Sequence, residues 1–331
     1  MKKIYIILWL VGQTFLTQAQ DVLTQVQVAI PYVDYNISVG KYYLKWFDSE
    51  NFYPTYLADP LGNRFEMSSQ NVLFSDFDTG DRINDEEGYL GRLSFYAGVR
   101  YSFFKFMSKK NPKLGIELEL GFMTPVIMRS GNHDLISVDG IYYLALAARP
   151  AEWIDLRFSK HHICTHIGDE FATGTVYSPV DFDVNTTQLP VRDDFILSAA
   201  IRPLHFIQPR YENRLQVYGD FGFFLPGADF LGERQNKPHK ESWFNYQAGA
   251  EISYPLKNKQ LGGFFLAGNV SAYQLNAWST NTSIKGGWFL PIGRTTSRLN
   301  IGLNYYNGRA LANQFYNRHE RFLAFFVNAD L

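Results

Sequence analysis

The sequence predicts an all-β protein, a closed antiparallel transmembrane β-barrel of about twelve strands with short periplasmic turns and longer external loops. Three observations predict this fold. Apolar and polar side chains alternate with a period of two residues, such segments recur along most of the chain, and very short connections alternate with much longer ones. A barrel in lipid needs this pattern, because each strand turns one face to hydrocarbon and the other to a polar interior.

The clearest of these segments is Lys113–Met128, with the sequence KLGIELELGFMTPVIM. Glu117 and Glu119 fall on its polar phase. A period of two indicates a strand, whereas the apolar positions of a helix recur every three or four residues. The apolar phase of the segment contains Leu114, Ile116, Leu118, Leu120 and Phe122.

Further segments of the same kind complete the predicted wall. Most of them exceed the roughly 9–11 residues that a tilted spanning strand needs. They are Glu66–Phe77, Leu93–Met107, Leu135–Arg149, Ala151–His166, Arg192–Phe206, Asn213–Leu225, Trp243–Leu256, Leu261–Tyr273, Asn281–Leu290, Ser297–Asn307 and Arg321–Leu331.

Connection lengths set the orientation of the predicted barrel. The turns SKKNP, QPRYEN, KNKQ and PIGRTT are short, whereas the connection Ile167–Val191 is long. Outer-membrane barrels carry short periplasmic turns and longer external loops. Both termini are therefore predicted to lie in the periplasm.

Charged side chains of both signs fall on the inward phase of the predicted strands. In hydrocarbon each charge would cost several kcal/mol, whereas inside a barrel the charges can pair with one another. Closure is required as well, because lipid offers no partner to the backbone groups of an open sheet edge. The predicted inward charges are Arg100, Glu117, Glu119, Asp139, Asp155, Arg157, Arg202, Asp220, Glu251, Lys285 and Arg298.

Composition agrees with this class of protein and excludes others. Aromatic residues make up 17% of the chain, yet the mean hydropathy is −0.19. Outside the N-terminus, no apolar run reaches the roughly 20 residues of a spanning helix. A formal net charge of −1 gives no reason to expect nucleic acid as a partner. The single Cys164 cannot form an intramolecular disulfide.

Three parts are predicted along the chain. Residues 1–19 have the features of a signal peptide: Lys2 and Lys3, the apolar run Ile4–Val11, and a small-residue cleavage site at Thr17–Ala19. Residues 20–65 form a periplasmic N-terminal segment or plug, and residues 66–331 form the barrel. A cleaved signal peptide and a barrel together predict a location in the cell outer membrane.

Three stretches resemble one known family. They are PTYLADPLGNRF (Pro54–Phe65), FSKHHICTHIGDEF (Phe158–Phe171) and NYYNGRALANQFY (Asn304–Tyr316). The outer-membrane family called domain of unknown function 1207 carries similar segments in the same order. The resemblance implies an outer-membrane barrel and supplies no activity. This sequence has Cys164 and Thr165 where the family tends to have two serines.

The middle stretch contains the candidate catalytic residues. In the segment Ala151–His166, the outward phase runs through His162 and Cys164, which are therefore predicted side by side on the lipid face near the outer leaflet. This pair resembles the His-x-Ser arrangement of outer-membrane phospholipase A and lipid A deacylase. The resemblance implies His162 as the base and Cys164 as the nucleophile, with Asp169 or Glu170 orienting the imidazole.

Two other interpretations of this cluster stay open. In the structural one, which we place first, the polar residues close the strand and tie the long loop back through hydrogen bonds. In the other, His161, His162 and His166 bind a metal ion with the two acids. Adjacent strand residues point in opposite directions, so His161 and His162 would not share an ion, and no metal site is predicted.

The last loop supplies the remaining candidates. Arg309 and Gln314 could bind lipopolysaccharide phosphate or cross the barrel mouth, with His161 and His166 as further binding candidates. The simpler interpretation is a turn with a solvated charge and loop packing. No phosphate-binding glycine loop, CxxC pair or HExxH motif is present, so no cofactor is predicted.

The first functional hypothesis is a non-enzymatic envelope protein, either structural or a narrow pore. The alternative is an outer-membrane lipid hydrolase that uses the His162–Cys164 pair, and the sequence leaves open whether the protein is an enzyme. The predicted partners are outer-membrane lipids, lipopolysaccharide and the barrel-assembly machinery.

Overall fold

The computed structural model describes residues 37–76, 91–131, 133–168, 189–224, 230–231, 244–292, 297–316 and 318–330. Each predicted strand is matched by one observed strand, and these strands form the wall. They are β3 (Phe65–Ser75), β4 (Gly91–Ser108), β5 (Gly115–Arg129), β6 (Leu135–Ala151), β7 (Ile154–Ile167), β8 (Leu189–Ile201), β9 (Leu215–Phe224), β11 (Phe244–Pro255), β12 (Gly263–Tyr273), β13 (Thr280–Pro291), β14 (Arg298–Arg309) and β15 (His319–Asp330).

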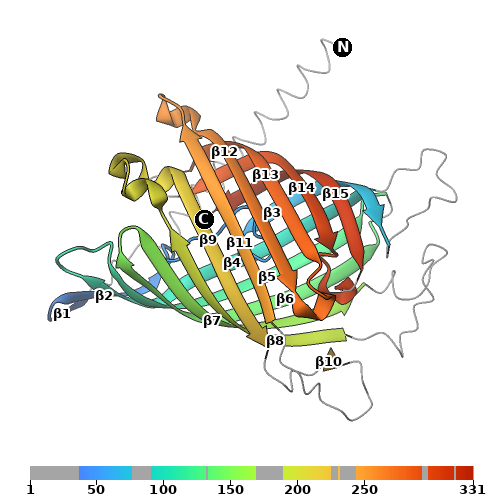
Figure 1. Ribbon diagram of the computed structural model, residues 1–331, viewed down its shortest axis with the longest axis horizontal. Helices are drawn as coiled ribbons and strands as arrows, with labels where there is room; N and C mark the ends of the chain where they lie inside the picture. Colours follow the sequence, from blue (N-terminus) through green and yellow to red (C-terminus); the bar gives the residue numbers. More distant parts are fainter. Residues whose placement is uncertain are drawn as a thin grey trace, which may run out of the picture. The chain divides into compact units, whose positions relative to one another are not determined.

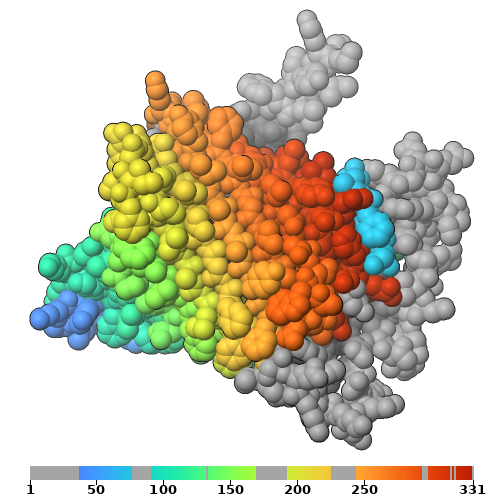
Figure 2. All heavy atoms as spheres, in the orientation of Figure 1, coloured from blue at the N-terminus to red at the C-terminus, as the bar shows by residue number. Residues whose placement is uncertain are grey.

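Within the described residues, these twelve antiparallel strands close into a barrel (Figure 1). Closure occurs at β3, which pairs with β15 on one side and with β4 on the other. The two-residue strand β10 (Phe230–Leu231) pairs with β8 outside the wall. The outer side chains of β11 to β15 form one unbroken surface (Figure 2). No helix among the described residues is long and apolar enough to cross a membrane.

Prolines and short 3-10 helices bound several strands. The segment predicted as Arg192–Phe206 ends earlier, at Ile201. Pro203 opens the 3-10 helix η1 (Pro203–His205) because it has no N–H to donate to a ladder. The other short helices are η2 (Pro209–Arg214), η3 (Lys259–Leu261), η4 (Gln274–Asn276) and η5 (Asn313–Phe315).

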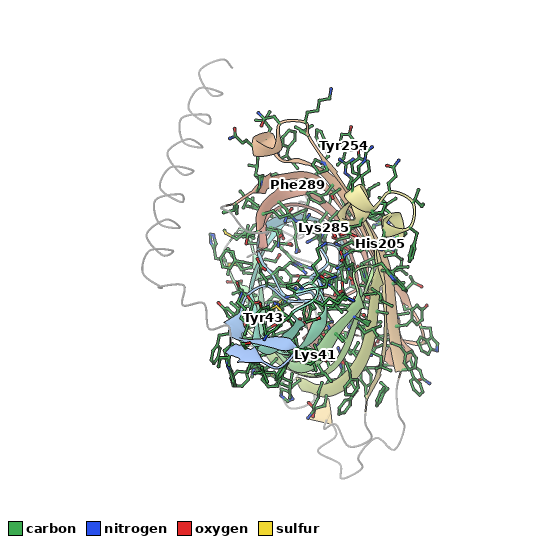
Figure 3. The ribbon with its side chains drawn as sticks, turned by 90° about the vertical axis from the view of Figure 1, so that its left-hand side faces the viewer. Lys41, Tyr43, His205, Tyr254, Lys285 and Phe289 are labelled. Carbon is green, nitrogen blue, oxygen red and sulfur yellow. The ribbon has the colours of Figure 1, made fainter. Side chains whose placement is uncertain are left out.

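Alternation places charge inside the barrel and apolar side chains outside, as the sequence predicts. Glu117 and Glu119 are fully buried on β5, whereas Leu120 and Phe122 of the same strand are more than 40% exposed. Lys285 points into the lumen from β13 (Figure 3), where its Nζ lies 2.6 Å from Glu66 Oε2. Lys285 and Glu66 therefore form an ion pair inside the barrel.

A β-bulge in β4 changes the phase of its last residues. The register with β5 shifts between Ser102 and Phe104. Strict alternation along the predicted strand would turn Lys105 outward, yet Lys105 is buried and lies 2.9 Å from Asp48. One extra residue in a strand moves all later side chains to the opposite face.

A hairpin precedes the barrel. Its strands are β1 (Ile37–Val39) and β2 (Tyr42–Asp48), joined at Gly40, whose φ of 55° favours glycine. The sequence predicts a periplasmic segment or plug at residues 20–65, and within it β2 pairs with the last residues of β4. β3 pairs with the first residues of the same β4 edge. The signal-peptide residues 1–19 lie outside the described residues.

Residues 49–64 leave the wall between β2 and β3 and lie inside the barrel; we call them the plug segment. Tyr56 stacks on Tyr218 with ring centroids 3.5 Å apart. Leu57 and Ala58 are buried against Phe265 and other inward side chains of the wall. Small wall residues leave room for these larger side chains, namely Ala147, Ala200 and Ala267.

Charged wall residues bind the backbone of the plug segment. The carboxylates of Glu117 and Glu251 accept hydrogen bonds from the amides of Phe52 and Leu57. Arg100 donates to the Tyr53 carbonyl oxygen at 2.7 Å. These bonds satisfy backbone groups that would otherwise be buried without partners. The segment separates a cavity of about 460 Å³ at the short-turn end from two cavities of about 50 Å³ nearer the long loops.

The last connection covers part of the opposite mouth. Ala312 and Phe315, which lie between β14 and β15, pack on Ile127 and Ile136. Asn313 donates through its backbone amide and its side chain to Asp139 on β6, at 3.0 and 2.9 Å. The connection therefore reaches across the lumen to the far wall.

Candidate functional site

The outer face of β7 carries the predicted catalytic pair. Leu156 and Phe158 are 41% and 43% exposed, and the same outward phase continues through Lys160, His162 and Cys164. Intervening residues such as Ser159 and Thr165 are buried toward the lumen. The structure thus confirms the predicted outward orientation of His162 and Cys164.

Asp193 on β8 lies directly opposite His162 in the register. Its Oδ1 is 2.7 Å from His162 Nδ1. An ionised carboxylate only accepts hydrogen bonds, so Nδ1 carries the hydrogen, and in the neutral imidazole Nε2 has the lone pair. Lys160 Nζ lies 3.2 Å from the other oxygen of Asp193. One carboxylate therefore orients the imidazole and pairs with a cation.

Tyr142 on β6 completes the cluster. Its ring stacks on the His162 imidazole, with centroids 5.5 Å apart and planes 14° apart. Its hydroxyl lies 3.0 Å from Cys164 Sγ. The thiol donates toward the carbonyl oxygen of Gly140 at 3.6 Å, so the phenol is the donor to sulfur. Gly140 leaves room for both groups, since an added Cβ would lie 2.8 Å from the phenol oxygen and 2.9 Å from Sγ.

Comparison with known proteins identifies the fold and no closer relationship. No family model and no curated protein matches the sequence. A solved structure of outer membrane phospholipase A from Escherichia coli matches with a TM-score of 0.51 and 11% identity. The match covers 81% of this chain and 93% of that one.

The chain has the fold of an outer-membrane β-barrel. Transmembrane β-barrels of this kind span bacterial outer membranes. Two further solved structures match at lower TM-scores. The Salmonella typhi outer membrane phospholipase dimer with bound calcium gives 0.48 at 12% identity, with 85% and 94% of the two chains covered. The translocator domain of the autotransporter NalP from Neisseria meningitidis gives 0.32 at 11% identity, with 83% and 91% covered.

His161 and His166 are separated from the outward pair. His161 faces the lumen, buried, with its ring 4.9 Å from that of Tyr143. His166 is exposed near the end of β7. Among the described residues, no three His, Cys, Asp or Glu side chains are grouped to hold a metal ion.

The other predicted residues lie apart from this cluster or outside the described residues. Asp169, Glu170 and the side chain of Gln314 fall outside the described residues. Arg309 lines one of the small lumen cavities, and its backbone amide donates to Asn281 Oδ1 at 2.7 Å.

Sequence reasoning missed Asp193 as the partner of His162. The two residues are 31 positions apart and meet only through the β7–β8 register. The available signal was the pair of acids at the start of the segment Arg192–Phe206, because antiparallel neighbours joined by a long loop bring the end of one strand beside the start of the next. Knowing the outward phase of that segment would have selected Asp193 over the inward Asp194.

The arrangement contains the parts of a nucleophilic site. A carboxylate fixes the tautomer of an imidazole, and a thiol two residues along the same strand faces the same way. The structure describes both His162 and Cys164 and shows no hydrogen bond between them. The sulfur is instead hydrogen-bonded to the phenol of Tyr142. Proton transfer from sulfur to Nε2 therefore requires a change of side-chain rotamer.

Proposed function

We propose that this barrel hydrolyses acyl esters of membrane lipids at the outward site on β7 and β8. His162 is the general base, Cys164 is the nucleophile, and Asp193 orients the imidazole. The observation that carries the proposal is the 2.7 Å hydrogen bond between His162 Nδ1 and Asp193 Oδ1 on the lipid-facing side of the wall.

The reaction proceeds in two halves. The thiol proton passes to His162 Nε2 as Sγ bonds to the ester carbonyl carbon. The ester C–O bond then breaks, and the alcohol leaves with the proton from Nε2, so that a thioester remains on Cys164. Water adds to the thioester as His162 accepts its proton, the C–S bond breaks, and the fatty acid is released.

One resemblance supports the choice of substrate, and a second supports the family. The Escherichia coli barrel that matches this chain is a phospholipase. The segment FSKHHICTHIGDEF resembles the motif of the family called domain of unknown function 1207, with Cys164 in the place of the first serine. We include membership of that family in the proposal, together with export by a cleaved signal peptide, insertion by the barrel-assembly machinery and contact with lipopolysaccharide.

The test is ester hydrolysis by the purified protein in detergent, with phospholipid and lipopolysaccharide as substrates. Replacing His162 or Cys164 with alanine is expected to abolish turnover. His205→Ala, at the opposite end of the barrel on η1, is the matched control and keeps full activity. Hydrolysis that survives Cys164→Ala would overturn the proposal, as would a wild-type protein without turnover on either substrate.

A narrow pore is the other function that the barrel suggests. The plug segment argues against it, because Tyr53 and Tyr56 fill the middle of the lumen and are almost fully buried. We propose that the barrel is sealed and serves as a rigid support for its outer site. Planar-bilayer recordings are expected to show no conductance steps, and steady unit conductance would refute sealing.

A further inference from the structure

We infer that Lys160 binds the phosphate of the lipid, so that the site takes phosphorylated acyl lipids in preference to neutral acylglycerols. The inference rests on the proposed function, because it names the class of lipid that the hydrolase takes. Phosphate binding can nevertheless be tested without hydrolysis. The phosphate could belong to a glycerophospholipid or to an acylated, phosphorylated sugar, and these two sources share the group that Lys160 recognises.

Strand register places Lys160 in an apolar part of the wall. Its neighbours across the ladder are Leu144 on β6 and Phe195 on β8. The same row continues to Leu120 and Phe223. The next row toward the short-turn end is entirely apolar and exposed, and contains Leu146, Phe158, Leu197 and Phe221. Lys160 is thus a cation on a lipid-facing surface.

The adjacent row marks the edge of that apolar surface. It contains Tyr142, His162 and Asp193. Tyrosine rings on the outside of a barrel favour the level of lipid headgroups. The ammonium of Lys160 therefore lies where the acyl chains of a lipid meet its esters and phosphate. A flexible lysine side chain reaches such a boundary from a deeper Cα position.

The ammonium of Lys160 has bonding capacity beyond its observed partner. An ammonium group has three N–H donors. Among the described residues, Asp193 Oδ2 at 3.2 Å is the partner that the structure gives it, and the side chain is 52% exposed. The other N–H donors of the ammonium face a lipid surface, and leaving them without acceptors there costs free energy unless lipid oxygens accept their hydrogen bonds. Phosphate oxygens are the strongest acceptors at that level.

The position also fits the proposed chemistry. Lys160 Nζ and His162 Nδ1 bind different oxygens of the same Asp193 carboxylate. The carboxylate keeps the cation close to the base without blocking Nε2. A lipid whose phosphate lies a few bonds from its ester can contact Lys160 while the ester carbonyl faces Cys164.

Binding is measured by native mass spectrometry of the full-length protein in detergent, in a Cys164→Ala background that prevents turnover. The probes are two matched pairs. One pair is dihexanoyl phosphatidylglycerol with dihexanoylglycerol, and the other is an acylated glucosamine disaccharide with and without its phosphate. The phosphate-bearing member of at least one pair is expected to bind about tenfold tighter, the effect of one charge-assisted hydrogen bond.

Substitutions at Lys160 decide whether this residue is the cause. Lys160→Met is expected to remove the phosphate preference, and Lys160→Arg to keep it, which also guards against a folding defect in the methionine variant. Lys113→Met, at the exposed opposite end of the barrel, is the matched control. A preference unchanged in Lys160→Met, or no preference in the parent protein, would overturn the inference.

The two proposals fail separately. Hydrolysis is assayed with Cys164 intact, and phosphate preference with Cys164 replaced. Lys160-dependent binding without any hydrolysis would refute the lipase and leave the phosphate site standing. Comparison of the two probe pairs identifies whether glycerophospholipid or phosphorylated sugar is the source.

Discussion

Asp193 determines what the imidazole of His162 can do. Its hydrogen bond to Nδ1 leaves the Nε2 lone pair available on the lipid-facing side. Without that carboxylate, a neutral histidine can place its hydrogen on either nitrogen. The chemistry of the outer site therefore depends on one residue from the neighbouring strand.

Asp193→Asn is expected to lower kcat for ester hydrolysis about a hundredfold or more with little change in KM. The amide can donate to Nδ1 and stabilise the wrong tautomer, in which Nε2 cannot accept a proton. The measurement is kcat and its pH profile in detergent. Unchanged kcat in a folded variant would show that Asp193 has only a structural role.

Gly140 keeps the thiol and the phenol in contact. In Gly140→Ala, the new methyl group would lie within 3 Å of the Tyr142 hydroxyl and of Cys164 Sγ, so both side chains must move. Alkylation of Cys164 by a maleimide is expected to slow about fivefold, because a hydrogen bond to the sulfur is lost. Gly268→Ala is the matched control, since the space around that glycine is open. Equal alkylation rates in both variants would contradict this geometry.

At the scale of elements, the plug segment and the bulge in β4 act together. The bulge turns Lys105 inward, where its Nζ lies 2.9 Å from Asp48 at the end of β2. The chain enters the lumen at that point. Carboxylates of the wall then bind the amides of Phe52 and Leu57. One extra residue in a wall strand thus helps to anchor the segment that fills the barrel.

Asp59 makes the stability of the plug segment depend on pH. Burial, and then the nearby Asp220, raise the pKa of Asp59 above its usual value. A native pKa above the unfolded one means that the carboxylate destabilises the fold at neutral pH, and that this cost falls as pH drops through the native pKa. Asp59→Asn is therefore expected to raise the melting temperature at pH 7, with the gain shrinking toward pH 4.

Asp48 is the control for Asp59, because its pKa is shifted in the opposite direction. Burial alone would raise the pKa of Asp48, but Lys105 and Lys45 together lower it. Its carboxylate therefore contributes stability at neutral pH that is lost in acid, so Asp48→Asn should lower the melting temperature at pH 7. If Asp59→Asn lowers the melting temperature at pH 7, as Asp48→Asn is expected to do, the assignment of Asp59 as a destabilising carboxylate is wrong.

At the scale of the whole molecule, the described barrel is closed around its sheet and filled across its lumen. β3 pairs with both β15 and β4, so the wall has no free edge there. The plug segment contacts inward residues of strands around the ring, including Ala147 on β6, Tyr218 on β9 and Phe265 on β12. The outer face is therefore the surface on which chemistry with lipids can occur.

Removing the plug segment is expected to open the barrel. Residues 51–62 are replaced with a short Gly-Ser linker, which still joins β2 to β3. The variant should give unit conductance steps in planar bilayers, whereas the parent protein gives none. The site on β7 and β8 lies outside the lumen, so ester hydrolysis should persist in the variant. A sealed variant that is folded would show that other side chains close the lumen.

Most of the wall was predictable from the sequence. Each predicted strand overlaps one observed strand, because alternation and the short turns both follow from local sequence. The exceptions have local causes that alternation does not reveal: the bulge beside Phe104, the early end of β8 before Pro203, and the pairing of β2 with β4. The outward direction of His162 and Cys164 was predictable for the same reason as the strands.

The sequence by itself determined the fold class, the strands, and which side chains face lipid wherever no bulge interrupts the strand, because a period of two fixes the two faces of a regular strand. Only the tertiary structure decided that Asp193 meets His162, that Lys160 shares the same carboxylate, and that residues 49–64 fill the lumen. The first two facts depend on the register between β7 and β8, and the third depends on the path of the chain from β2 through the lumen to β3. Both are set by contacts between residues far apart in sequence, which no local pattern records.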